Sequence, residues 1–188
     1  MKPIENNINK NCSAITSASG RAFDFLDISN QSISIEDIAH ALSHICRFTG
    51  HSKEFYSVAQ HSVLVSYSVP EEYALQGLLH DAAESVLGDV STPLKQLLPD
   101  YNALEQQIEK AIFSQFNIPE TLHPCVKEAD LRLLMTEVRD LTCQTESSLK
   151  FYAQYAHIKP LSQTITPMWP EFARQRFLER FHELTINE

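Results

Sequence analysis

Apolar residues recur at helical spacing in three long segments of this 188-residue chain. A repeat of three or four residues places such side chains on one face of an α-helix, where they can be buried together. The segments are 101–116 with Leu104, Ile108, Ala111 and Ile112, 124–142 with Leu131, Leu134, Met135 and Val138, and 169–184 with Phe172, Phe177, Phe181 and Leu184. The pattern predicts an all-α fold, built as a helical bundle.

Shorter segments predict further helices, with boundaries set by capping residues, glycine and proline. Ser34 followed by Asp37 is typical of a helix cap and predicts a helix over 35–46. The other expected helices are 56–67, 70–87 and one that begins near Pro119. Residues 23–27 are expected to be extended, and the polar stretch 1–19 to be loosely ordered, because it has few bulky apolar residues.

Composition narrows the class of protein. A chain of this length with 43% hydrophobic residues can build one well-buried domain, so residues 1–188 are expected to form a single domain. The 15 Lys and Arg against 24 Asp and Glu give a net charge of −9, which disfavours binding of nucleic acid through a basic surface. Only four glycines are present, so no glycine-rich phosphate loop is expected.

The chain has no segment with the apolar length of a secretory signal or a membrane span. Its four cysteines have no short spacing between any two of them, which disfavours both a zinc knuckle and a disulfide framework. These features predict a cytoplasmic protein that does not associate with membranes. A bound metal would have to be held by other side chains.

The adjacent pair His80 and Asp81 is the strongest signal of chemistry. Such a histidine alone is more often an ordinary helix residue, but 74–79 is apolar, and unpaired polar groups at its end would be costly. With His61 and Asp130 the pair offers two imidazoles and two carboxylates. This mixed nitrogen and oxygen set suits a first-row divalent ion with open positions for water, provided the four side chains converge.

Two further carboxylates follow the pair. Glu84 lies four residues after the histidine and three after the aspartate, which on a helix places it on the same face. Gly88 predicts a helix stop, and the turn ahead of Pro93 can carry Asp89 back toward the pair. As simpler alternatives, Glu84 could pair with a nearby cation, and Asp89 could cap its own turn.

The run 80–95, HDAAESVLGDVSTPLK, resembles the signature of HD-domain phosphohydrolases, in particular the branch of YfbR- and YfdR-like 5′-deoxynucleotidases. The similarity extends to Arg47-Phe48, His61-Ser62 and 126–130, and so spans residues 40–140 or thereabouts. Phage dATP triphosphohydrolases are similar as well. The resemblance implies a single HD-domain helical bundle and a metal-dependent phosphoric ester hydrolase with one divalent ion. Cobalt, manganese, zinc, magnesium, iron and nickel are not distinguished.

The resemblance also implies a role for each matching residue. The metal ligands would be His61, His80, Asp81 and Asp130, and the residues that handle water and protons would be Glu84 and Asp89. Arg47 would orient the phosphate, and Phe48 would pack beside the nucleoside. The sugar and phosphate would be lined by Asp89, Val90, Ser91 and Thr92, and polyphosphate would be contacted by Lys95 and Lys127. Arg47 would act as a forked, always-charged clamp. Phe48 and Ser91 stand where some relatives have tryptophan and proline, and the loss of an indole donor changes the nucleoside contact.

Simpler alternatives exist for these roles too. Arg47 and Lys95 could be solvated surface charges, and Phe48 could be an ordinary core residue. His51 is expected to be a loop residue. Tyr152, Tyr155 and the region of Pro160 are expected to form a loop near the mouth of the site.

Three functions stay open. The favoured one is hydrolysis of a deoxynucleoside 5′-monophosphate to deoxynucleoside and phosphate, the second is a dNTP triphosphohydrolase that releases triphosphate, and the third is a non-catalytic nucleotide-binding protein. The sequence does not decide which of Glu84 and Asp89 is acid or base, nor which nucleobase is preferred. Related nucleotidases are often oligomeric, and the apolar stripe of 169–184 could be core or subunit contact, so a homo-oligomer, a dimer or larger, is expected.

Overall fold

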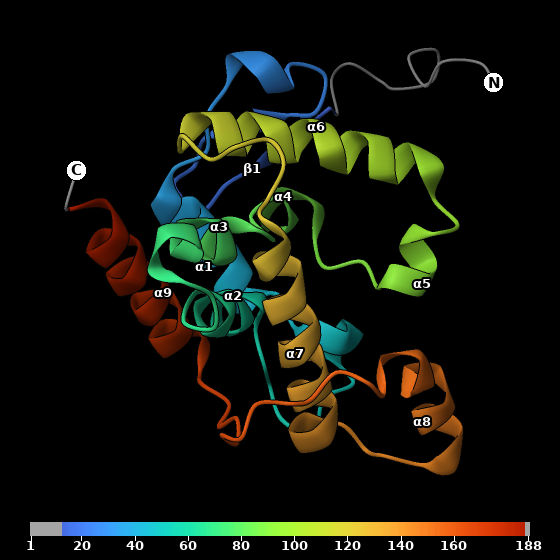
Figure 1. Cartoon of the computed structure of the whole chain (residues 1–188). Coiled ribbons are helices and arrows are strands. Elements are labelled where there is room, and N and C mark those ends of the chain that lie inside the picture. Colours follow the sequence, from blue (N-terminus) through green and yellow to red (C-terminus); the bar gives the residue numbers. More distant parts are fainter. Residues whose placement is uncertain (1–12, 187–188) are drawn as a thin grey trace.

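The computed structural model describes residues 13–186, most of which are helical. In chain order the elements are β1 (Ala14–Thr16), β2 (Ala22–Asp24), η3 (Ile28–Asn30), α1 (Ile35–His44), η4 (Arg47–Gly50), α2 (Val58–Ser66), η5 (Glu71–Tyr73), α3 (Ala74–Leu79), α4 (Glu84–Leu87), α5 (Thr92–Lys95), α6 (Pro99–Gln115), α7 (Pro124–Leu141), α8 (Glu146–Tyr152), η6 (Ala153–Tyr155) and α9 (Pro170–Thr185). Figure 1 shows the long helices α6, α7 and α9 arranged around the shorter helices α1 to α4.

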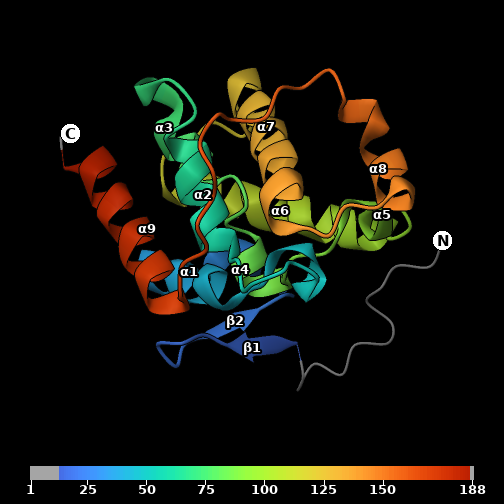
Figure 2. The same cartoon turned by 90° about the horizontal axis from the view of Figure 1, so that it is seen from below.

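Helix α2 lies at the centre of the fold, where it contacts α1, α3, α7 and α9 (Figure 2). Its sequence, VAQHSVLVS, has small or apolar residues on every side and no charged residue other than a titratable histidine, and eight of its nine residues are buried. Ser57 begins the helix by accepting a hydrogen bond from the Gln60 N–H. Because neighbours surround this helix, His61 is held in the interior of the protein with no solvent exposure.

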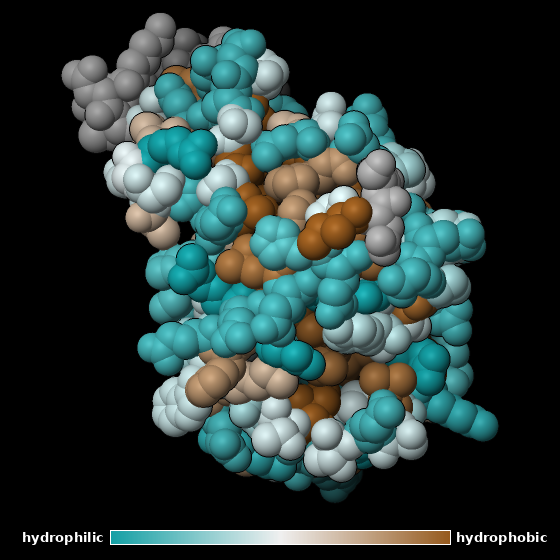
Figure 3. Space-filling view, turned by 90° about the vertical axis from the view of Figure 1, so that its left-hand side faces the viewer, coloured by the Kyte–Doolittle hydropathy of each residue, from teal (hydrophilic) through white to brown (hydrophobic). Residues whose placement is uncertain are grey.

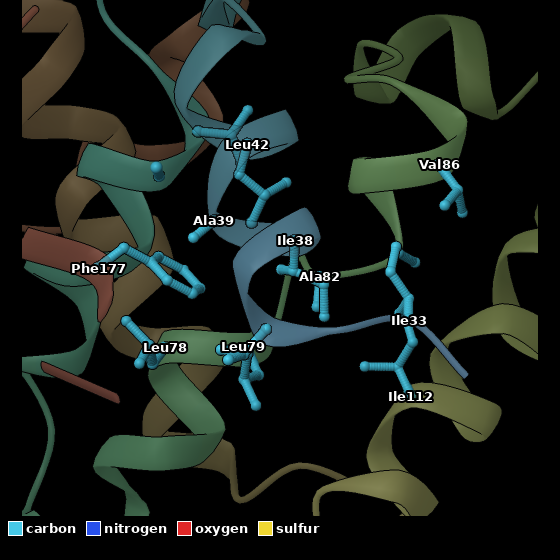
Figure 4. Packing of buried hydrophobic residues seen from close by; sticks show 14 of the residues in the cluster. Ile33, Ile38, Ala39, Leu42, Leu78, Leu79, Ala82, Val86, Ile112 and Phe177 are labelled. Atoms are coloured by element: carbon cyan, nitrogen blue, oxygen red, sulfur yellow. The ribbon is translucent and has the colours of Figure 1, made fainter. Parts of the chain in front are cut away.

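The larger core cluster joins α1, α3 and α9 and is shown in Figure 4. Its fully buried members include Ile38, Leu42, Leu78, Leu79 and Phe177. Phe177 thus packs inside its own subunit, and the apolar stripe of the predicted helix over 169–184 is at least in part core. A second cluster packs α7 against α2 through residues that include Val65, Val126 and Leu133.

Two short strands correct the all-α prediction to a mostly helical fold with one small sheet. Strands β1 and β2 pair antiparallel, and Phe23 of β2 is buried in the core. The hydroxyls of Ser17 and Ser19 donate hydrogen bonds of 3.0 and 2.7 Å to the buried carboxylate of Asp37. The prediction of a loose segment is therefore wrong for residues 13–19, because hydroxyl groups rather than apolar side chains attach this segment to α1. Residues 1–12 lie outside the described range.

Five predicted helices are confirmed, with shifts of a few residues at their ends: 35–46 as α1, 56–67 as α2, 101–116 as α6, 124–142 as α7 and 169–184 as α9. The predicted cap of α1 is present, since the Ser34 hydroxyl accepts the Asp37 N–H. The predicted helix near Pro119 is wrong. Residues 117–123 form no helix, and α7 begins at Pro124, where a missing N–H has no cost.

The predicted continuous helix over 70–87 is also wrong. Helix α3 ends at Leu79, and residues 80–83 form a tighter turn in which Ala82 and Glu84 donate to carbonyls three residues back, at 3.0 Å each. Helix α4 resumes at Glu84 for about one turn. The positions of Asp81 and Glu84 are therefore set by this turn and not by a regular helix face.

A close approach of α3 to α2 depends on Gly77. A Cβ atom at this position would lie 3.1 Å from the Ser66 Cα atom, so no larger residue fits without a shift of the backbone. This contact brings the end of α3, where His80 lies, toward the middle of α2.

The face that carries α9 is largely hydrophilic, with its apolar side chains gathered in separate patches (Figure 3). Trp169 and Phe172, at the start of this helix, are 71% and 59% exposed. Within residues 13–186, no helix combines the length and the apolar character needed to cross a bilayer. The expected single HD domain, homo-oligomer and cytoplasmic location stay predictions.

Candidate metal centre and adjoining pocket

Three of the four predicted ligands form a compact group. His61 from α2, His80 at the end of α3 and Asp130 from α7 each bring one ligand atom within 4.8 Å of the others. The two Nε2 atoms are 3.3 Å apart, and Asp130 Oδ1 lies 3.4 Å from His61 Nε2. This group could hold a metal ion.

The fourth predicted ligand, Asp81, lies beside both imidazoles. Its Oδ2 atom is 3.2 Å from His80 Nε2 and 3.7 Å from His61 Nε2. The compact group does not include Asp81, which therefore stands next to the three and not among them. Three separate segments of the chain thus place the four predicted residues close to one another.

The hydrogen bonds of the two rings assign their tautomers. His80 Nδ1 lies 2.8 Å from the carbonyl oxygen of Gly77, and His61 Nδ1 lies 2.6 Å from Glu137 Oε1. Both partners can only accept when Glu137 is ionised, so each Nδ1 is the donor and each neutral ring presents a lone pair at Nε2. A divalent ion that displaced the proton of a charged imidazole would meet one Nε2 lone pair from each ring. The donor set therefore fits a divalent metal, with imidazoles oriented as metal ligands usually are.

The charges of the group are strongly coupled. Burial alone would raise the pKa of Asp130 and Asp81, but His61 and His80 outweigh it and hold both carboxyl pKa values well below the usual range. Burial and Arg47 disfavour the charged form of His61, yet Glu137 and Asp130 raise the pKa of this imidazole to about 9. Both aspartates are accordingly ionised at neutral pH.

Sequence reasoning missed Glu137, which is completely buried. Its Oε1 accepts hydrogen bonds from His61 and from the Tyr56 hydroxyl at 2.9 Å, and its Oε2 accepts from Arg47 Nε and Nη2 at 3.2 and 3.0 Å. Burial opposes ionisation, but Arg47 and His61 lower the pKa of Glu137 to about 2. A signal was present: Glu137 lies seven residues after Asp130, two turns along the same face of α7.

This carboxylate changes the expectation for Arg47. The guanidinium is not a solvated surface charge, because Arg47 is only 13% exposed and two of its nitrogens bind Glu137. The remaining nitrogen, Nη1, lies 3.7 Å from Asp81 Oδ2. The guanidinium group that was expected to bind phosphate through two nitrogens therefore binds Glu137 with two of them. Only Nη1 is left to contact a ligand.

Phe48 and Thr49 follow Arg47 in the left-handed region, with φ of 55° and 53°. Non-glycine residues rarely adopt this conformation, which costs energy and is concentrated at functional sites. The Phe48 ring centroid lies 5.8 Å from the Arg47 guanidinium carbon. Phe48 is half-buried and is not one of the core residues.

A pocket of about 450 Å³ adjoins the histidine group, in the range of small-molecule sites. Its lining contains eleven predicted site residues, Arg47, Phe48, Asp81, Glu84, Asp89, Val90, Ser91, Thr92, Lys95, Lys127 and Asp130, together with Thr49, Pro93, Leu131, Leu134, Tyr152 and Tyr155. Tyr152 and Tyr155 line the pocket as expected, but the predicted loop is wrong at these residues, because they lie in α8 and η6. His51 ends the η4 turn outside this lining, as expected for a loop residue.

Glu84 is the least satisfied acid in the pocket wall. It is 5% exposed, and its Oε2 atom is buried with no hydrogen-bond partner in the described chain. Its Oε1 lies 3.5 Å from Lys95 Nζ. Glu84 therefore has the nearby cation that the simpler alternative expects, but the ion pair is a long one. Burial, Asp81 and Asp89 raise the pKa of Glu84 well above its usual value, and burial likewise raises the pKa of Asp89.

The two lysines predicted to meet polyphosphate are already paired. Lys95 Nζ lies 2.6 Å from Glu105 Oε1, and Lys127 Nζ lies 2.6 Å from Asp130 Oδ2. Lys95 is 23% exposed and is therefore not a solvated charge, whereas Lys127 is 72% exposed. Both reach the pocket, but neither is a free cation.

The fold and site together define a mostly helical protein with a histidine and aspartate group that could hold a metal ion beside an acidic pocket. No protein-family model matches the sequence. The chain is 42% identical over 174 residues to the uncharacterized protein YfdR of Escherichia coli, a match that covers 92% of this chain and 96% of YfdR. It is also 39% identical over 121 residues to an uncharacterized protein of Rhodobacter capsulatus, covering 59% of this chain and 62% of that protein. The chain therefore belongs to the YfdR family.

Proposed function

We propose that this protein is a metal-dependent phosphohydrolase of the HD type, with deoxynucleoside 5′-monophosphates as the favoured substrates. The observation that carries the proposal is Glu84. This carboxyl group is buried, has one unpartnered oxygen and a raised pKa, and lines a pocket whose wall also contains Asp130 of the histidine group and the neighbouring Asp81. A buried acid of this kind, beside a candidate metal group, is suited to proton transfer.

The cation would be held by His61, His80 and Asp130, with Asp81 beside them. When bound, a divalent ion would supply an acidified water and a positive charge for a phosphoryl oxygen. The other elements of the reaction belong to the side chains of the chain itself.

Hydrolysis forms a bond between the water oxygen and phosphorus, breaks the bond from phosphorus to the 5′ oxygen, and requires a proton on the departing oxygen. Glu84 is the better proton donor, since burial and Asp81 keep it protonated to higher pH. Asp89 is less buried, and it is suited to orient the attacking water. Arg47 would hold a phosphate oxygen through Nη1, and Phe48 with Tyr152 would enclose the nucleoside.

Triphosphate hydrolysis is the second candidate. It gains no support from Lys95 and Lys127, because each already has a carboxylate partner at 2.6 Å. A monophosphate needs fewer cations and is the simpler ligand for a pocket of this size.

The test compares Glu84→Gln with the wild type on dAMP, dATP and AMP, after the metal has been removed and replaced by manganese, cobalt, zinc or magnesium. We expect the wild type to release orthophosphate from dAMP, and Glu84→Gln to retain metal while losing nearly all turnover. Glu179→Gln is the control, because Glu179 is an exposed acid on α9 that does not line the pocket. Full activity of Glu84→Gln would exclude the proposed role, and release of triphosphate from dATP alone would favour the second candidate.

A further inference from the structure

A second groove, of about 690 Å³, lies against the outer side of α7. Helix α7 contributes Pro124, Lys127, Glu128, Leu131 and Arg132, and the segment after η6 contributes His157, Ile158 and Lys159. Three apolar residues are thus combined with three permanent cations, one histidine and a single acid. We call this feature the α7 groove.

The cations of the α7 groove are unusual in this chain because two of them lack acidic partners. Within residues 13–186, five lysines and arginines form no ion pair with a described carboxylate: Arg21, Lys53, Arg132, Lys159 and Arg174. Arg132 and Lys159 both line this groove. Unpaired cations that share one concave surface, in a chain of net charge −9, favour an anionic ligand.

The α7 groove adjoins the pocket of the proposed active site. Lys127 and Leu131 line both hollows, so one face of α7 separates them by the width of these two side chains. Because Lys127 is held by Asp130 on the pocket side, Arg132 and Lys159 are the cations available on the groove side. An anion there would lie close to, but outside, the candidate metal group.

We propose that the α7 groove is a phosphate-binding subsite, used by a phosphorylated small molecule next to the catalytic pocket. Phosphate suits a guanidinium and an ammonium group together, since its oxygens accept several charge-assisted hydrogen bonds. The apolar residues Pro124, Leu131 and Ile158 supply a surface for the organic part of the ligand. The phosphate belongs either to a second group on the ligand of the catalytic pocket or to a separate molecule.

The first experiment titrates inorganic pyrophosphate into the full-length protein by calorimetry, with a chelator present so that bound metal does not contribute. We compare the wild type with Arg132→Ala/Lys159→Ala. The matched control is Arg21→Ala/Arg174→Ala, which removes the same charge from two other unpaired cations. We expect the groove variant to lose affinity by about tenfold or more, as for the loss of charged hydrogen-bond donors, and the control to change little. Equal affinity of the groove variant and the wild type, or no binding by the wild type, would overturn the subsite.

The second experiment identifies the source of the phosphate and rests on the proposed function only for its choice of nucleotides. Deoxyadenosine 5′-monophosphate and 3′,5′-bisphosphate are titrated into Glu84→Gln protein, with and without the two groove substitutions. A gain in affinity for the bisphosphate that the groove substitutions remove would assign the phosphate to the ligand of the catalytic pocket. If the groove substitutions weaken pyrophosphate binding but the bisphosphate binds no more tightly than the monophosphate, the phosphate in the groove belongs to a separate molecule. Failure of the hydrolase proposal would appear as wild-type protein without turnover and would leave both binding results intact.

Discussion

Replacement of Glu137 by Gln should be among the most damaging single-atom changes in this protein. Glu137 is fully buried and accepts hydrogen bonds from Tyr56, His61 and two nitrogens of Arg47. A glutamine has one accepting oxygen, and its amide nitrogen would face groups that are themselves donors. At least one buried donor, and the Arg47 charge, would lose its partner.

Two estimates of the cost agree. Removal of one partner from a buried ion pair costs about 3–5 kcal/mol, because the other charge stays buried. Burial opposes ionisation of Glu137, but Arg47 and His61 hold its pKa at about 2 against 4.5 for an ordinary glutamate. At about 1.4 kcal/mol per pH unit, this difference corresponds to about 3 kcal/mol of stability.

The pH dependence follows with a definite sign. A carboxyl group whose pKa is lower in the folded protein stabilises the fold fully above the unfolded value of 4.5 and loses this contribution as the pH falls toward 2. Urea unfolding of wild type and Glu137→Gln should therefore differ by about 3–5 kcal/mol at pH 7 and by progressively less below pH 4.5.

The control is Glu179→Gln, which breaks an exposed pair with Arg176 on α9. Exposed pairs contribute about 0–1 kcal/mol, so this variant should unfold almost as the wild type does. A loss of less than about 1 kcal/mol for Glu137→Gln at pH 7 would refute the reasoning, because it would mean that the buried network has no more value than an exposed pair.

Three further predictions follow from the packing and charges. Gly77→Ala should reduce the free energy of unfolding by about 1–3 kcal/mol in urea titrations, because its Cβ would lie 3.1 Å from the backbone of Ser66; a gain in stability would show that α2 and α3 can move apart. Burial and Glu105 raise the pKa of Glu109 to about 7, so ionisation of this carboxyl group lowers the stability of the fold as the pH rises from 4.5 through 7. In urea unfolding, Glu109→Gln should therefore be more stable than the wild type at pH 8 and equally stable near pH 4. Equal stability at both pH values would contradict this prediction. Addition of a divalent ion to chelator-treated protein should raise the melting temperature, by the equivalent of about 2.7 kcal/mol at an ion concentration of 100 times Kd. Asp130→Asn should abolish this increase. An identical increase in the variant would exclude Asp130 as a ligand.

The long helices could be predicted because their apolar residues keep one spacing over several turns. The break between α3 and α4 could not, since residues 80–83 remain close to helical backbone and only their hydrogen bonds change from four residues to three. The attachment of residues 13–19 depends on Asp37, a buried acid whose partners are serine hydroxyls. Periodicity of apolar residues contains no information about such contacts.

For the candidate site, residue types and their order along the chain predicted the neighbourhood but not the pairing within it. His61, His80 and Asp130 converge as expected, in a group that could hold a metal ion. The partner of Arg47 was missed, because Glu137 is distant in sequence and lies in a segment whose other side chains fit an ordinary amphipathic helix. The pairing of Lys95 with Glu105 was missed for another reason, since it depends on how α5 packs against α6.

The balance of charge in the pocket gives the strongest physical argument for a cation. Four acids line its wall, Asp81, Glu84, Asp89 and Asp130, against the cations Arg47, Lys95 and Lys127. Each of these cations already has a carboxylate partner within 3.0 Å. A phosphate dianion that entered such a pocket would meet the carboxylates of its wall, which repel it. A divalent ion among the histidines and aspartates would reverse the sign of the local field. Under the proposed function, a phosphate ester would therefore enter this acidic pocket only after a metal ion, and the raised pKa of Glu84 would suit its carboxyl group to proton transfer.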